Sequence, residues 1–312
     1  MNYEEILLNL VENDERIMVL TAENRAAIRN LPQKIGERFI DVGITEQTMI
    51  GVAAGLALRG RIPVTHALAA FLIMRAFEFI RTDVGIAHLP VKIVGYVPGF
   101  LSEANGPTHQ AIEDISLMRG IPGMNVFCPA DEEDMLIGLN QVLLDPNPFY
   151  IRYNNLKPVV KHKTYFEIGG SETITFGNDI TILTYGMLLR QAYEAMIILE
   201  SKGLGVRLIN MRTLKPIDET AVLSAAEETP LIVTLEDHFV SGGLYSILAE
   251  LFLREDVQAH VLPIALNSKW FKPALLQDVL QYEGFTGPQI AEKILKHYEL
   301  KRKETAAVKS LI

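Results

Sequence analysis

The sequence is short of the features that mark several classes of protein. It has one cysteine in 312 residues, Cys128, which excludes an internal disulfide and a four-cysteine zinc site and is typical of a reducing compartment. Acidic residues outnumber basic ones, and the net charge of −9 disfavours nucleic acid or an anionic membrane as a partner. No apolar run approaches the roughly 20 residues that span a bilayer, and the first residues lack the pattern of a secretory signal. We therefore expect a cytoplasmic protein.

Short apolar runs alternate with helical patterns along the chain, and its length suits two domains. This alternation predicts an α/β fold of two domains, each a mainly parallel sheet flanked by helices. Polar and glycine residues weaken the pattern between 157 and 178, so we expect a first domain at 1–163, a linker at 164–176 and a second domain at 177–312. The expected strands are 17–20, 39–42, 91–97, 125–128, 149–152, 180–184, 206–209, 231–235 and 259–263. The expected helices are 3–11, 45–58, 69–86, 132–144, 189–202, 218–226 and 244–253.

The most informative segment is 41–57, DVGITEQTMIGVAAGLA. Thr45 is placed to cap a helix, and Glu46 enters the first turn, where the helix dipole favours a negative charge. Residues 50–57 leave almost no polar face, so we expect this helix to be buried and closely packed on both sides. Glu46 then lies at the edge of an apolar layer, where a carboxyl group is a candidate for proton exchange.

This segment resembles the glutamate-bearing motif of the pyrimidine-binding domain in transketolases and their split-chain relatives. The resemblance implies that Glu46 hydrogen-bonds the aminopyrimidine ring of thiamine diphosphate and activates the cofactor, with Ile44 as a neighbouring cofactor contact. A second segment, 70–78 (AFLIMRAFE), resembles a family run that ends in Arg-Ala-aromatic-Glu. It implies that Phe71 packs on the aminopyrimidine ring.

A third segment, 106–110 (GPTHQ), also resembles a transketolase motif. Glycine and proline fix the loop, so His109 is presented from rigid backbone. The resemblance implies that His109 binds the substrate and transfers a proton. The remaining histidines match no ligand spacing, and we assign no metal ligand to this chain.

The second domain resembles the transketolase C-terminal domain through 210–218 (NMRTLKPID) and 236–238 (EDH) ahead of Gly242 and Gly243. In the family this domain mainly supports dimer packing, so we expect no catalytic residue in it. The chain lacks the Gly-Asp-Gly motif that holds magnesium and the diphosphate in such enzymes. We therefore expect an N-terminal partner subunit to carry that motif, in an α2β2 assembly, and the isolated chain to be inactive.

The resemblance implies a thiamine-diphosphate-dependent transferase that moves a two-carbon ketol unit from a ketose-like donor to an aldehyde acceptor. One alternative is the β subunit of a 2-oxo acid dehydrogenase, which shares the fold and the glutamate. The GPTHQ motif favours transketolase. A second alternative is a non-catalytic regulatory subunit, which the presence of Glu46, Phe71 and His109 disfavours.

The expected substrate-binding residues depart from the family pattern. Asn105 stands where transketolases usually have an aspartate, and Val97 stands where a phosphate-binding histidine is common. Arg152 is the one residue that matches a family phosphate contact. We therefore expect a substrate other than an ordinary pentose or hexose phosphate, such as an unphosphorylated, branched, sulfonated or nucleotide-linked sugar. Its anion could also be held by Arg25, Arg29 or the partner.

Overall fold

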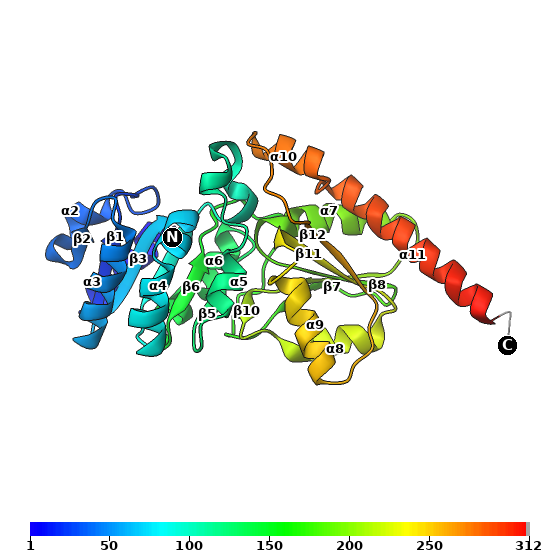
Figure 1. Ribbon diagram of the computed structural model, residues 1–312, viewed down its shortest axis with the longest axis horizontal. Helices are drawn as coiled ribbons and strands as arrows, with labels where there is room; N and C mark the ends of the chain where they lie inside the picture. The colour runs from blue at the N-terminus through cyan, green and yellow to red at the C-terminus, as the bar shows by residue number, and fades with distance from the viewer. Residues whose placement is uncertain (310–312) are drawn as a thin grey trace.

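The computed structural model describes residues 1–309 and confirms two α/β domains (Figure 1). Sheet A has the strand order β10-β5-β6-β4-β3-β1-β2, with all pairs parallel except β10 with β5. Its strands are β1 (Ile17–Thr21), β2 (Phe39–Asp41), β3 (Ile62–Leu68), β4 (Lys92–Tyr96), β5 (Asn125–Phe127), β6 (Phe149–Arg152) and β10 (Thr213–Lys215).

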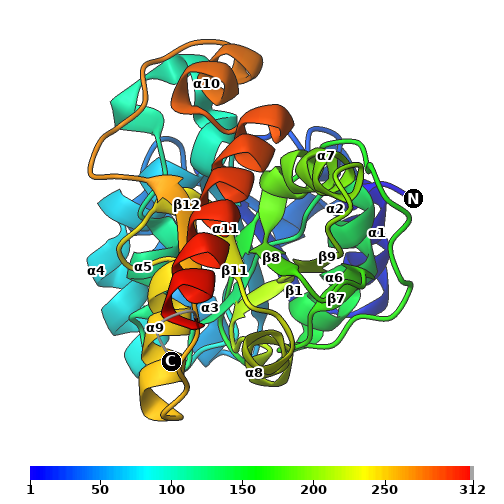
Figure 2. The ribbon, with the colours of Figure 1, turned by 90° about the vertical axis from the view of Figure 1, so that its right-hand side faces the viewer.

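Sheet B has the order β12-β11-β8-β9-β7 and is parallel except for the β7–β9 pair. Its strands are β7 (Glu172–Thr175), β8 (Ile180–Thr184), β9 (Val206–Asn210), β11 (Ile232–Phe239) and β12 (Val261–Leu266). Its helices are α7 (Leu189–Glu200), α8 (Glu219–Glu228), α9 (Leu244–Arg254), α10 (Leu276–Glu283) and α11 (Gly287–Lys309), with a 3-10 turn at Gly186–Leu188. Helix α11 packs along α7, as Figure 2 shows.

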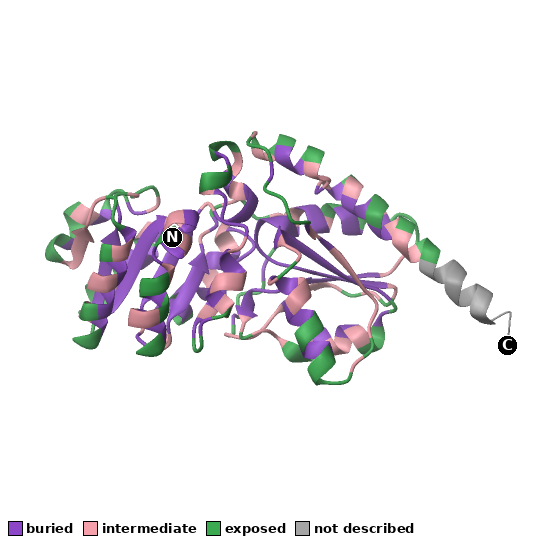
Figure 3. Ribbon diagram, viewed as in Figure 1, coloured by how far each residue is buried: buried purple, intermediate pink, exposed green. Residues whose placement is uncertain are grey.

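Two groups of helices pack in separate apolar clusters on sheet A. One cluster holds α1 (Tyr3–Asn13), α2 (Leu31–Ile35) and α6 (Glu132–Leu144). The other holds α3 (Glu46–Leu58), α4 (Phe77–Phe79) and α5 (Asp114–Arg119), and it continues into the second domain through residues of α8 and α9. Short 3-10 turns lie at Gly36–Arg38, Gly99–Asn105 and Pro107–His109, and π-helical turns at Phe71–Arg75 and Ile80–Ile86. Most strands run through the purple, buried interior in Figure 3, whereas β2, β7 and β12 are mainly half-buried.

The structure differs from the expected elements at three points. Strand β3 was not predicted, because Pro63, Thr65 and His66 dilute its apolar pattern, although almost the whole strand is buried between β1 and β4. The expected helix 69–86 is divided by wide π-helical turns. Within the segment 164–176, expected as a linker, β7 (Glu172–Thr175) pairs with β9 in sheet B, and β10 returns from the second half of the chain to sheet A.

The expected second domain also includes residues 310–312, which lie outside the described part. None of the helices described is long and apolar enough to cross a membrane.

Candidate cofactor and substrate site

Glu46 lies where the chain passes from β2 into α3. Gly43 adopts a positive φ of 71° just before the helix, which glycine tolerates without a Cβ penalty. Thr45 is the residue before the first turn, but its hydroxyl donates to the carbonyl of Val42 at 2.9 Å and not to the helix, so its predicted capping role is wrong. Glu46 is only 2% exposed, as expected for the edge of an apolar layer.

A line of contacts joins Glu46 to the His109 loop. The guanidinium of Arg75 donates to Oε2 of Glu46 at 2.8 Å. The same guanidinium lies over the ring of Phe71, 4.4 Å from its centroid. Phe71 in turn meets the ring of His109, with the centroids 4.8 Å apart at an angle of 61°. Three segments far apart in the sequence, 46, 71–75 and 109, therefore form one cluster.

Sequence reasoning missed Arg75 as part of this cluster. It occurs in the quoted 70–78 segment, four residues after Phe71, and that spacing is the signal that could have found it. In the part of the chain that the structure describes, Oε1 of Glu46 accepts no hydrogen bond, whereas Oε2 is held by Arg75. Arg75 therefore fixes the orientation of the carboxylate and leaves one oxygen for a ligand.

The His109 loop contains the glycine-proline turn that the sequence predicts. Gly106 has a φ of 83°, Pro107 follows it, and His109 ends a single 3-10 turn. The Nδ1 atom of His109 lies 2.9 Å from the hydroxyl of Thr108, which leaves Nε2 for another partner. Asn105 is exposed on the same loop, and its amide donates to the carbonyl of Ser102 at 3.2 Å.

Arg152 does not have the role that the sequence suggested. Its side chain is 3% exposed and lies between two buried carboxylates, with Nε 2.9 Å from Asp114 and Nη1 2.7 Å from Asp237. Burial lowers the pKa of Arg152, but the two carboxylates raise it well above its usual range, so the guanidinium keeps its charge. A substrate phosphate cannot reach it without breaking this buried pair, and the prediction of Arg152 as a phosphate contact is wrong.

One face of α3 is open, which corrects the expectation of close packing on both sides. Met49, Ile50 and Ala53 are buried against sheet A. On the opposite side, at helical spacing, the stripe Ile44, Thr48, Gly51, Gly55 and Leu58 is exposed or half-buried. A Cβ added at Gly51 or Gly55 would meet no atom of the described residues within 4 Å. Phe79 and Ile86, from the neighbouring turns, are exposed as well.

The described residues fit one half of a thiamine-diphosphate site. A carboxylate with one unoccupied oxygen suits a ring nitrogen that carries a proton, and Phe71 offers an aromatic surface beside it. Ile44 is 67% exposed next to the start of α3, where a cofactor ring could contact it. The exposed stripe leaves the rest of such a site to be completed from outside this chain.

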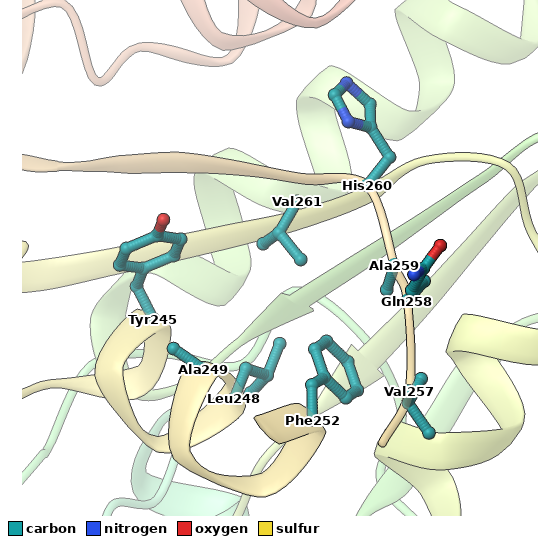
Figure 4. Close-up of a pocket in the computed structure, with 9 residues that line it drawn as sticks. All are labelled: Tyr245, Leu248, Ala249, Phe252, Val257, Gln258, Ala259, His260 and Val261. Atoms are coloured by element: carbon teal, nitrogen blue, oxygen red, sulfur yellow. The ribbon is translucent and has the colours of Figure 1, made fainter. Parts of the chain in front are cut away.

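Two other clusters do not form a site of this kind. Both ring nitrogens of His162 are hydrogen-bonded, to Glu172 at 2.6 Å and Asp131 at 2.8 Å. Burial lowers the pKa of His162, but these carboxylates raise it to about 10, so the ring is held as a buried ion pair with Asp131 and Glu172. A pocket of about 400 Å³ between α9 and β12 (Figure 4) contains none of the predicted residues.

Two features indicate the class of protein: the paired α/β domains, and the carboxylate at the start of a helix of small residues. They are typical of the pyrimidine-binding and C-terminal part of a thiamine-diphosphate-dependent enzyme. Residues 2–157 match the family model described as transketolase, pyrimidine binding domain. Residues 169–290 match the one described as transketolase, C-terminal domain. The chain therefore belongs to the transketolase family.

Several relatives are separate subunits. The chain is 40% identical over 253 residues to the 6-deoxy-6-sulfo-D-fructose transketolase subunit SqwH of Clostridium sp. (strain MSTE9), covering 80% of this chain and 78% of that one. It is 32% identical to an apulose-4-phosphate transketolase subunit of Phocaeicola vulgatus, covering 84% and 86%. A solved structure described as a split gene transketolase, inactive beta4 tetramer, superposes with a TM-score of 0.86 at 33% identity, covering 96% and 97%.

The chain spans about half the length of other curated relatives, the 1-deoxy-D-xylulose-5-phosphate synthases. Its similarity to the split subunits, in contrast, covers most of both chains. The chain is thus of the C-terminal subunit type found in split transketolases.

Proposed function

We propose that this chain supplies the cofactor-activating half of a two-chain transketolase, which moves a two-carbon ketol unit from a ketose-like donor to an aldehyde acceptor. The observation that carries the proposal is the contact line from Glu46 through Arg75 and Phe71 to His109. It brings a proton-exchanging carboxylate, an aromatic surface and an imidazole together at one edge of sheet A.

Each residue has a separate task in this proposal. Thiamine diphosphate, when bound, supplies the electron sink for breaking the carbon–carbon bond. Glu46 exchanges a proton with the ring nitrogen through Oε1, while Arg75 holds Oε2 in place. Phe71 and Ile44 pack against the ring. His109 binds a substrate hydroxyl and moves a proton through Nε2, and Asn105 offers an amide that can donate or accept.

We propose that the exposed stripe of α3 docks on an N-terminal partner subunit. This surface begins at Ile44, next to Glu46, and includes the open positions of Gly51, Gly55 and Leu58. The partner would hold magnesium and the diphosphate on its Gly-Asp-Gly motif, which this sequence lacks. Two copies of each chain would give two complete sites in an α2β2 assembly. The single buried cysteine supports the cytoplasm as its compartment.

The substrate is proposed to be a sugar other than the common phosphorylated pentoses. Arg152 is committed to a buried pair, and Arg25 is ion-paired with Asp41. Arg29 has no hydrogen-bond or ion-pair partner among the described residues, and it is the one basic residue lining a pocket of about 420 Å³. The polar lining of this pocket also includes Asn2, Asn30, Tyr153 and the acidic residues Glu4 and Glu132. This pocket lies beyond the ends of β1 and β6, at the same edge of sheet A as the site. We propose that Arg29 holds the distal anion.

The similarity to a sulfofructose transketolase subunit makes a sulfonated ketose the first donor to test. The chain is combined with the product of the neighbouring reading frame, thiamine diphosphate and magnesium, and ketol transfer is assayed. Donors are 6-deoxy-6-sulfofructose, apulose 4-phosphate and xylulose 5-phosphate. We expect turnover by the complex with one of the first two, weak turnover with xylulose 5-phosphate, and no activity in the chain alone.

Two results would contradict the proposal. Robust turnover by this chain without a partner would refute the composite site. Oxidation of a 2-oxo acid by the complex with an artificial electron acceptor, without ketol transfer, would indicate the dehydrogenase alternative.

The variant Arg29→Gln tests the proposed anion contact. It should raise the KM for the anionic donor about tenfold or more while leaving kcat nearly unchanged, since one charged hydrogen bond is worth about 1.5–3 kcal/mol.

A further inference from the structure

The loop that carries Asn105 and His109 is held largely by the second domain. Gly99 and Phe100 begin the loop, and the ring of Phe100 packs edge-on against Phe271 at 5.3 Å and Phe285 at 4.9 Å. At the other end, the amide of Gln110 donates to the backbone carbonyl of Phe271 at 2.8 Å. Both contacts are buried, and both cross from the first domain to the second.

A charged contact lies beneath the start of this loop. Asp237, near the end of β11, is 1% exposed, and its carboxylate packs directly against the backbone of Gly99, where an added Cβ would lie only 1.9 Å from Oδ2. Its Oδ1 atom accepts from Nη1 of Arg152 at 2.7 Å. The carboxylate therefore ties the loop backbone to the end of β6, across the domain boundary.

The packing around Gly99 leaves this contact no room to shift. Gly99 has a φ of 58°, and a Cβ there would overlap the carboxylate of Asp237 and lie 2.8 Å from Nη2 of Arg152. The backbone N–H of Gly99 also donates to the carbonyl of Ala111 at 2.9 Å, which closes the loop on itself. A displacement of Asp237 would thus move the start of the loop directly.

We propose that Asp237 is a positioning residue for substrate, through which the C-terminal domain sets the place of His109. The sequence pattern indicated only a packing role for this domain. The buried contacts extend that role, because the domain fixes both ends of the loop on which the substrate groups lie. The inference rests on the proposed role of His109, but the anchoring itself is independent of it.

The decisive variant is Asp237→Asn. An amide replaces one acceptor oxygen by an NH2 donor, so either the guanidinium of Arg152 or the start of the loop at Gly99 then faces a donor in place of a carboxylate oxygen. We expect the two-carbon transfer of the assembled complex to fall about 10- to 100-fold in kcat/KM, with most of the loss in kcat. Exchange of the cofactor C2 proton, which depends on Glu46, should stay within about twofold of the wild type. A purely structural role would lower both readouts in parallel.

A second readout does not require activity. Amide hydrogen exchange of peptides covering 97–112 should accelerate in Asp237→Asn, while peptides from α3 keep their protection. Gln110→Leu removes the other anchor without touching the buried charges, and it should give the same pattern. If Asp237→Asn does not fold, Gln110→Leu carries the test.

Glu250→Gln is the matched control, because Glu250 also bridges the two domains, through Arg119 at 2.9 Å, but on the surface and away from the loop. It should behave as wild type in every assay. Unchanged loop exchange and unchanged transfer in both Asp237→Asn and Gln110→Leu would overturn the inference. If instead the loop loosens but the wild-type complex transfers no ketol unit, the proposed function fails and the anchoring stands.

Discussion

Two buried carboxylates lie at the starts of two helices, and their surroundings differ. Glu236 in the second domain is fully buried, and its two oxygens accept the backbone N–H groups of Leu244 at 2.7 Å and Tyr245 at 3.0 Å. Glu46 in the first domain is almost as buried, yet among residues 1–309 only its Oε2 has a hydrogen-bond partner, the side chain of Arg75. Both use the positive end of a helix dipole.

We infer from this difference that Glu236 is a structural carboxylate, whereas Glu46 is available to the proposed cofactor. Both oxygens of Glu236 are already occupied by the protein, so it can stabilise α9 but cannot accept anything from outside. Glu46 keeps Oε1 available beside a face that the chain leaves open. Burial alone therefore does not distinguish the two carboxylates, whereas the unused oxygen of Glu46 beside an open face does.

The largest expected effect is the loss of turnover when Glu46 is replaced. Glu46→Gln keeps the shape and one oxygen, but it cannot exchange a proton, so turnover of the complex should fall about 10²- to 10⁴-fold. Exchange of the cofactor C2 proton, followed by NMR after acid quench, should fall with it. Assembly and thermal stability should remain close to wild type. Wild-type exchange in this variant would remove Glu46 from the mechanism.

At Glu236 we expect a loss of stability without a loss of activity. Glu236→Ala leaves the N–H groups of Leu244 and Tyr245 without their acceptor, at a cost of about 1–3 kcal/mol for each donor that water does not reach. Urea unfolding should show this loss, while the turnover of the folded fraction stays near wild type. A large drop in turnover without a loss of stability would reverse the distinction between the two carboxylates.

The pH dependence sharpens the same comparison. Burial raises the pKa of Glu236 from 4.5 to about 8, although the N–H groups of Tyr245 and Leu244 oppose the shift. The folded chain then binds this proton more tightly than the unfolded chain. The stabilisation from Glu236 is therefore present in acid and is lost as the pH rises from about 4.5 through about 8, with a slope of at most about 1.4 kcal/mol per pH unit. Glu236→Ala should lack this component.

Local patterns predicted the parts of the site that depend on few residues. The strand-to-helix turn at Glu46 and the glycine-proline turn at His109 could be recognised because each is encoded within a few positions. Arg152 could not be interpreted correctly, because its burial depends on Asp237, 85 residues further along the chain.

The same limit applies to the fold. Strand β10 joins sheet A by pairing with β5 across a long sequence separation, and short strands of this kind carry no periodic signal of their own. The open face of α3 was missed for another reason. An all-apolar helix predicts burial, but it does not reveal whether the cover comes from the same chain.

The smallest expected effect is a change in stability when a glycine on the open face of α3 is replaced. The comparison is with α6, a helix that is covered by its own chain. Gly55 in α3 and Gly138 in α6 both lie inside 13-residue helices. A Cβ at Gly55 meets nothing within 4 Å, whereas a Cβ at Gly138 would lie 2.9 Å from Phe127. Gly55→Ala should therefore stabilise the free chain by about 0.5–1 kcal/mol in urea unfolding, the usual gain in helix propensity. Gly138→Ala should destabilise the free chain.

The docking role of the same face is tested by a larger side chain. Gly55→Leu should leave the free chain folded and weaken its assembly with the partner in analytical ultracentrifugation. Wild-type assembly of Gly55→Leu would show that the stripe on α3 is not the docking face.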